Sequence, residues 1–104
     1  MASQQQTVDY ICEQLGGAGD ISSRRMFGEY GLYCDGKFIG VICDDTLFLK
    51  VTDQARALEP QITLAPAYEG AKPSFMIPAE ILEDAPRLAG FARAVHDGLP
   101  AKKK

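Results

Sequence analysis

The chain has 104 residues, of which 46% are hydrophobic and 24% charged, a balance typical of one globular domain and unlike that of a disordered chain. Its 11 basic and 14 acidic residues give a net charge of −3, which is unfavourable for gripping nucleic acid through clustered cations. Its apolar runs are too short for a membrane helix and its first residues lack the features of a signal peptide, so we expect a cytoplasmic protein without membrane contact.

An amphipathic helix is the first predicted element. The spacing of apolar residues predicts a helix over 5–15, because positions i, i+3, i+4 and i+7 share one helix face. These residues are Val8, Ile11, Cys12 and Leu15. The glycine-rich run 16–19 predicts the end of the helix, since glycine readily takes the left-handed conformation found beyond helix C-termini. Over 21–52 the apolar period changes to two, which predicts β-strands.

Two short turns divide this region into a three-stranded meander. Asp35-Gly36 is a strong signal for a two-residue type I′ turn, which needs positive φ at both positions, and Asp44-Asp45 is a weaker one. Two-residue loops fix the register of the strands. The predicted pairs are Tyr33 with Phe38, Gly31 with Gly40, Ile42 with Leu47, and Gly40 with Leu49.

That register assigns the side chains to two faces. The expected core face consists of Tyr33, Phe38, Ile42, Leu47, Leu49 and Val51, with Gly31 and Gly40 side by side as a floor for a helix. The expected opposite face consists of Tyr30, Leu32, Cys34, Ile39, Val41, Cys43 and Phe48, diluted by lysines and threonines. This opposite face is too apolar for water, so we expect a second copy of the chain or the segment 60–72 to cover it. The residues expected at the seam of a homodimer are Leu32, Ile39, Val41 and Phe48.

The signals weaken after residue 52. Asp53 as an N-cap predicts a short helix ending at Leu58. Residues 62–72 suit a loop or an irregular strand. Residues 73–78 are apolar and bounded by prolines, which suits an edge strand.

A second long helix closes the predicted fold. Residues 80–83 suit one turn of helix, and Asp84 is a good N-cap for a final helix that ends at Gly98. Its apolar stripe consists of Leu88, Phe91, Ala92 and Val95. We expect His96 to be exposed to solvent in the last turn. No linker or repeat interrupts the sequence, so we expect one domain over 1–104 with a flexible basic tail over 98–104.

Residue patterns for catalysis and for metal binding are weak. One histidine and three scattered cysteines lack the spacing of a zinc site, and no glycine-rich phosphate loop follows a strand. The acidic pairs Asp44-Asp45 and Glu83-Asp84 suit turn and capping positions. We therefore expect no catalytic residues, no cofactor and no metal. The three cysteines are expected to be reduced and mostly buried: Cys12, Cys34 and Cys43.

Two adjacent arginines precede the densest aromatic segment. In a strand, neighbouring side chains point to opposite faces, so Arg24 and Arg25 differ in role. The structural interpretation is ion pairing with nearby carboxylates, and the functional one is recognition of a phosphate or an acidic partner. The carboxylates considered are Glu29, Asp44 and Asp45. We include Arg24, Arg25 and Tyr30 among the candidate interaction residues.

The sequence resembles the amino-terminal domain family of the TfoX competence regulators, also called Sxy. The motifs that carry the resemblance are Arg25-Met26-Phe27-Gly28, Tyr30-Gly31-Leu32-Tyr33, Asp35-Gly36 and the strand through Leu47 to Val51. Phe75-Met76-Ile77-Pro78 and Ile81-Leu82-Glu83-Asp84 are similar to the family's second half, so the resemblance spans about residues 7–97. Two positions depart from the pattern. Glu29 replaces a frequent glycine, and Phe91 replaces a frequent tryptophan.

The resemblance implies a two-layer α+β domain, in which a meandering antiparallel sheet is flanked by amino- and carboxy-terminal helices, as in secretion-chaperone-like folds. Longer members continue into a helical carboxy-terminal domain and activate bacterial competence genes with the cyclic-AMP receptor protein. We expect this chain to lack that second domain, so the full activator role does not carry over.

These observations predict a non-enzymatic regulatory module that works by protein contact, either with transcription machinery or as a homodimer. Two alternatives remain open. The first is direct nucleic-acid binding through Arg24, Arg25 and the lysine tail 102–104. The second is a small-ligand or enzyme site in a pocket beside the glycine pair.

Overall fold

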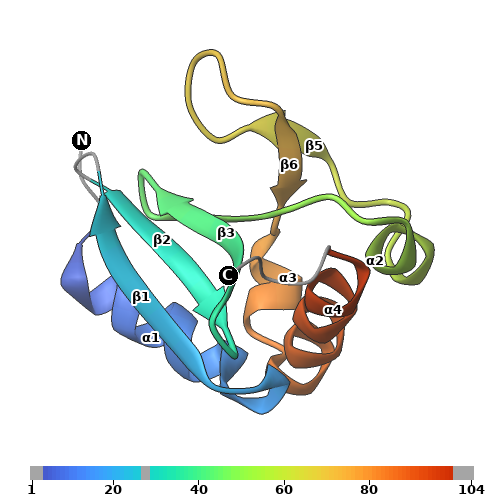
Figure 1. Cartoon of the computed structure of the whole chain (residues 1–104), viewed down its shortest axis with the longest axis horizontal. Helices are drawn as coiled ribbons and strands as arrows, with labels where there is room; N and C mark the ends of the chain where they lie inside the picture. Colours follow the sequence, from blue (N-terminus) through green and yellow to red (C-terminus); the bar gives the residue numbers. More distant parts are fainter. Residues whose placement is uncertain (1–3, 27–28, 100–104) are drawn as a thin grey trace.

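The computed structural model describes residues 4–26 and 29–99 (Figure 1). Within them, strands in the order β1-β2-β3-β4-β6-β5 form one six-stranded antiparallel sheet, in the expected α+β arrangement. The strands are β1 (Ile21–Met26), β2 (Glu29–Cys34), β3 (Lys37–Cys43), β4 (Thr46–Leu49), β5 (Leu64–Pro66) and β6 (Pro73–Met76). The helices are α1 (Gln5–Leu15), α2 (Asp53–Leu58), α3 (Ala79–Leu82) and α4 (Ala85–Gly98), with a 3₁₀ turn η1 (Gly16–Ala18) after α1.

The predicted first helix and both predicted turns are confirmed. α1 has the expected bounds, and its stripe residues Val8, Ile11 and Leu15 are buried. Positive φ angles occur at Asp35 (53°), Gly36 (84°), Asp44 (54°) and Asp45 (60°), as a type I′ turn requires.

The sheet is larger than the predicted three-stranded meander. β1 pairs with β2 along its whole length and adds a fourth strand to the meander. β6 lies between β4 and β5, so the prediction that residues 73–78 form an edge strand is wrong. The edge is β5, which lies in the segment predicted as loop or irregular strand. Long-range pairing of this kind leaves no local signal in the sequence.

A β-bulge in β3 changes the predicted register with β2. The observed pairs are Tyr33 with Phe38, Leu32 with Gly40, and Gly31 with Val41. The first pair is as predicted, but Ile39 is an extra residue without a partner, which shifts all pairs beyond it by one position. The prediction that Gly31 and Gly40 lie side by side is therefore wrong. An added Cβ at Gly40 would lie 2.1 Å from the Phe48 carbonyl oxygen, so this glycine allows close approach of β4 rather than of a helix.

The bulge also corrects the assignment of the two sheet faces. The inner face, defined as the face that packs against α1 and α4, consists of Tyr30, Leu32, Cys34, Ile39, Ile42, Leu47 and Leu49. Four of these residues were expected on the opposite face: Tyr30, Leu32, Cys34 and Ile39. Tyr33 and Phe38 were expected in the core but lie outside, because a one-residue shift exchanges the faces of a strand. β3 and β4 keep the predicted register, so the inward placement of Ile42, Leu47 and Leu49 is confirmed.

The carboxy-terminal helix covers the inner face as predicted. Its apolar stripe is buried, and the Phe91 ring packs edge-on against Phe75 with a centroid distance of 4.9 Å. The Asp84 carboxylate caps the helix by accepting from the Arg87 N–H at 3.3 Å. In Figure 1, α1 passes behind β1 and β2, and α4 stands beside α3.

Two end-of-helix predictions need correction. The N-cap of α2 is Thr52 rather than Asp53, since the Thr52 hydroxyl accepts from the Ala55 N–H at 3.2 Å. The His96 side chain is only 14% exposed, so the prediction that it is exposed to solvent is wrong. The carbonyl groups at this end of α4 are capped by Lys37, whose Nζ donates to His96 O at 2.9 Å and Leu99 O at 3.2 Å.

Candidate interaction surface

The outer face of the sheet, defined as the face opposite to α1 and α4, carries a continuous row of opposed residues. The row consists of Arg24 on β1, Gly31 on β2, Val41 on β3, Phe48 on β4 and Met76 on β6. Opposed residues of an antiparallel sheet are close enough for their side chains to touch. Phe48 is 7% exposed within this row, whereas Met76 is 38% exposed. The row is therefore apolar and nearly covered at Phe48, and open to water at Met76.

An aromatic pair lies beside this row. The rings of Tyr33 and Phe38 are tilted against each other with centroids 5.4 Å apart, and both side chains are half-buried. Lys50 lies over the Phe38 ring, with its Nζ 5.1 Å from the ring centroid, within the range of a cation–π interaction.

An open hollow of about 270 Å³ borders this aromatic pair. Its lining comes from β3, the residue after β4, the loop between β5 and β6, and β6 itself. The residues are Phe38, Gly40, Val41, Lys50, Ala67, Tyr68, Ala71, Lys72 and Ser74. Tyr68 is 62% exposed. Two ammonium groups beside aromatic walls suit an apolar side chain flanked by carboxylates.

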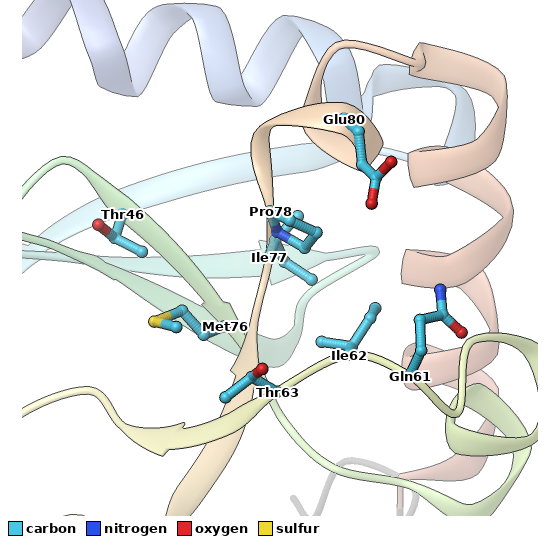
Figure 2. Close-up of a pocket in the computed structure, with 8 residues that line it drawn as sticks. All are labelled: Thr46, Gln61, Ile62, Thr63, Met76, Ile77, Pro78 and Glu80. Carbon is cyan, nitrogen blue, oxygen red and sulfur yellow. The ribbon is translucent and has the colours of Figure 1, made fainter.

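A second hollow of about 350 Å³ lies on the opposite side of the row from the first, where β4 begins (Figure 2). It is lined by Thr46, Gln61, Ile62, Thr63, Met76, Ile77, Pro78 and Glu80. Figure 2 shows the Glu80 carboxylate turned toward the hollow, with Thr46 and Met76 on its far side. Met76 belongs both to this hollow and to the apolar row, so the two features form one surface.

The structure separates the residues that were expected at a homodimer seam. Val41 and Phe48 lie on the outer face, as expected. Leu32 and Ile39 are fully buried on the inner face, so their expected place in an exposed seam is wrong. The cause is the β-bulge, which reverses the face of these two residues relative to the predicted register.

Tyr30 and the two arginines occupy different faces. Tyr30 lies on the inner face, where its hydroxyl donates to Gln5 Oε1 at 3.1 Å. Arg25 pairs with Tyr30 across the strands and lies over its ring, with Cζ 5.9 Å from the centroid. Arg24 pairs with Gly31 on the outer face, so the prediction that the arginines point to opposite faces is confirmed.

This arrangement does not favour the nucleic-acid alternative, because Arg24 and Arg25 point to opposite faces of β1 and form no common basic patch. The tail residues 100–104 and the motif residues 27–28 lie outside the described ranges. Glu29, one of the carboxylates considered as an ion-pair partner, has Oε2 3.1 Å from the backbone N–H of Asp44, which donates to it.

Two outer-surface residues were missed by sequence reasoning: Lys72 and Met76. The prolines around residues 73–78 signalled a strand, but they could not show that it pairs with β4 and places Met76 beside Phe48. Tyr68 and Lys72 lie in a loop whose position depends on that same pairing.

The strongest ion pair lies away from the outer face. The Arg87 guanidinium donates to both carboxylate oxygens of Glu59, each at 2.7 Å. Together with a hydrogen bond from Gln61, this lowers the pKa of Glu59 to about 2. Arg93 pairs with Asp35 at 2.8 Å. The hydrogen bond from the Asp20 N–H, followed by that from Arg93, lowers the pKa of Asp35. These pairs have structural roles.

The cysteines are free thiols, with Cys34 and Cys43 buried and Cys12 half-buried. Burial raises the pKa of all three thiols, which disfavours the reactive thiolate. In the described part of the chain, no three metal-ligating side chains come together. None of the described helices has the length and apolar character to cross a membrane.

Comparison with known proteins gives a matching family and a similar protein. The family model described as TfoX N-terminal domain matches residues 13–98. The chain is also similar to the uncharacterized 12.7 kDa protein in the trpE 5′ region of Spirochaeta aurantia. The two are 34% identical over 103 residues, which cover 99% of this chain and 89% of that protein.

Proposed function

Because the chain belongs to the TfoX N-terminal domain family, we propose that it is a non-enzymatic regulatory module that works by protein contact. The process that we propose it regulates is transcription, as in the competence regulators whose amino-terminal domain it resembles. The contact surface is the outer face of the sheet.

One observation carries this proposal: the apolar row Val41, Phe48 and Met76 lies on the sheet face opposite to α1 and α4. An antiparallel sheet that faces water on one side normally carries polar residues there. This face instead carries apolar residues at its centre and charged residues at its rim, which is the arrangement of protein interfaces. The hollows on the two sides of the row are open grooves of this surface, so a protein contact fits them better than an enclosed small ligand.

A site-specific crosslink tests the proposal. A photoreactive phenylalanine analogue at position 48 is expected to crosslink a protein in cells that express the chain, whereas the same analogue at Leu58 is not. Leu58 is the matched control because it lies on α2 and is 58% exposed, so it is more accessible to chance contacts than Phe48.

A substitution on the same surface completes the test. Val41→Glu places a carboxylate in the apolar row and is expected to abolish the crosslink from position 48. Equal crosslinking from positions 48 and 58, or a crosslink that Val41→Glu leaves unchanged, would overturn the proposed function.

A further inference from the structure

The outer face carries opposite charges at its two ends along the direction of its strands. From Thr46 to Lys50 the chain crosses this face over about 13 Å at the rise of a β-strand, and Phe48 lies midway. Cations gather at the Lys50 end of the outer face, and carboxylates gather at the Thr46 end.

The cations of the Lys50 end are Lys50 and Lys72, which line one hollow. Within residues 4–26 and 29–99, no carboxylate lies within 4 Å of either ammonium group. Glu69 is in the same loop as Lys72 but is not part of the lining. In contrast, Arg87 and Arg93 are held by carboxylates of this chain. The Lys50 end therefore offers positive charge to a second molecule.

The carboxylates of the Thr46 end come from three elements. Glu29 begins β2 and lies on the outer face, because the next residue, Tyr30, lies on the inner face. Its side chain accepts from the N–H of Asp44, an exposed residue of the β3–β4 turn, which brings both to this end. The Glu80 carboxylate faces the hollow beside Thr46 (Figure 2).

We propose that a second copy of this chain lies face to face on the outer surface, with its strands running in the opposite direction. The inference rests on the proposed function and names the partner. A twofold axis within the interface and perpendicular to the strands reverses their direction, so the Lys50 end of each copy meets the Thr46 end of the other. An axis parallel to the strands would bring like charges together. The charges at the two ends of the face thus favour a second copy in this orientation, and they must outweigh the repulsion between the two Arg24 side chains, which the same axis places opposite each other.

The centre of the face suits this twofold arrangement. Phe48 lies midway between the charged ends, so the small exposed part of its side chain is near the axis. Val41 and Met76 flank Phe48 on the neighbouring strands, and a methionine adapts its shape to an opposing surface. The result is an apolar centre between two charged contacts.

Charge reversal at the two ends provides a specific test. The first variant combines Lys50→Glu with Lys72→Glu, and the second combines Glu29→Lys with Glu80→Lys. Each variant carries the same sign of charge at both ends, so its own dimer is repelled in the proposed orientation. A mixture of the two variants is complementary at both contacts, so it is expected to form a heterodimer.

Sedimentation velocity from about 1 to about 200 µM protein measures the outcome. The wild type is expected to dimerise, each variant to dissociate at least about tenfold more readily, and the equimolar mixture to regain the wild-type affinity. Circular dichroism checks that both variants remain folded. A monomeric wild type, a dimer that charge reversal leaves intact, or a mixture that fails to associate overturns the inference.

The two proposals fail in distinguishable ways. If position 48 crosslinks a different protein and the wild type is monomeric in solution, the proposed function stands and the homodimer is wrong. If position 48 crosslinks nothing and the wild type is monomeric, both are wrong.

Discussion

Substitution of Gly40 by alanine should damage this fold, although it adds only one methyl group. Gly40 follows the bulge in β3 and pairs with Leu49 of β4. A Cβ at this position would lie 2.1 Å from the Phe48 carbonyl oxygen and 3.0 Å from the Leu49 Cα. Both are backbone atoms of β4, so no side-chain rotation removes the overlap.

The cost follows from the movement that the overlap requires. Cβ atoms essentially never approach a heavy atom within 3.0 Å, so β4 must move by nearly 1 Å. Overpacking of this kind costs about 1–3 kcal/mol. The shift also strains the hydrogen bond from the Lys50 N–H to Ile39 O, now 2.8 Å, which is worth about 1 kcal/mol. We expect Gly40→Ala to lower the free energy of unfolding by about 3 kcal/mol, out of roughly 5–15 kcal/mol for a small domain.

Gly90→Ala is the matched control for this measurement. Gly90 lies in α4 with no atom within 4 Å of an added Cβ, so alanine there should stabilise the protein by about 0.5–1 kcal/mol through helix propensity. Urea unfolding followed by far-ultraviolet circular dichroism gives both values. A Gly40→Ala variant within about 1 kcal/mol of the wild type would refute the reasoning.

Two further predictions concern stability. The folded-state pKa of Glu59, about 2, is below its ordinary value of 4.5, so its ion pair with Arg87 contributes stability that is complete above about pH 4.5 and lost as the pH falls to about 2. In urea unfolding, the wild type should therefore exceed Glu59→Gln in stability at pH 7, and the difference should shrink between pH 4.5 and 2; a constant difference contradicts the prediction. Lys37→Met removes the cap of α4 but keeps the apolar stem, and should cost about 1 kcal/mol. A urea midpoint equal to that of the wild type would show that this cap contributes nothing.

Local elements of the fold were predictable because their signals lie within a few residues. The stripe of α1, the capping of α4 by Asp84 and the positive φ angles at Asp35 and Gly36 each follow from neighbouring residue types. The cap of α2 was misplaced by one residue, since both Thr52 and Asp53 are good N-cap residues and only geometry distinguishes them.

The faces of the sheet were not predictable in the same way. Alternation along β3 gives no sign that Ile39 is an extra residue, because a bulge depends on how two strands meet. Because of this one extra residue, Leu32 lies in the core and Tyr33 on the outer face, the reverse of the prediction. The interaction surface was therefore only partly predictable: Val41 and Phe48 follow from the turn at 44–45, whereas Met76 depends on a strand pairing with no local signal.

Among the described strands, β1 lies at one edge of the sheet, and this position has a consequence for solubility. A strand edge can template further strands, and a chain that leaves one exposed risks growth into fibres. Arg24 and Arg25 lie in the exposed stretch of β1 and point to its two faces. If the β1 strands of two molecules paired edge to edge, their four guanidinium groups would lie in one short stretch and repel one another. The two arginines thus disfavour edge-to-edge association at β1, because they place positive charge on both faces of the strand.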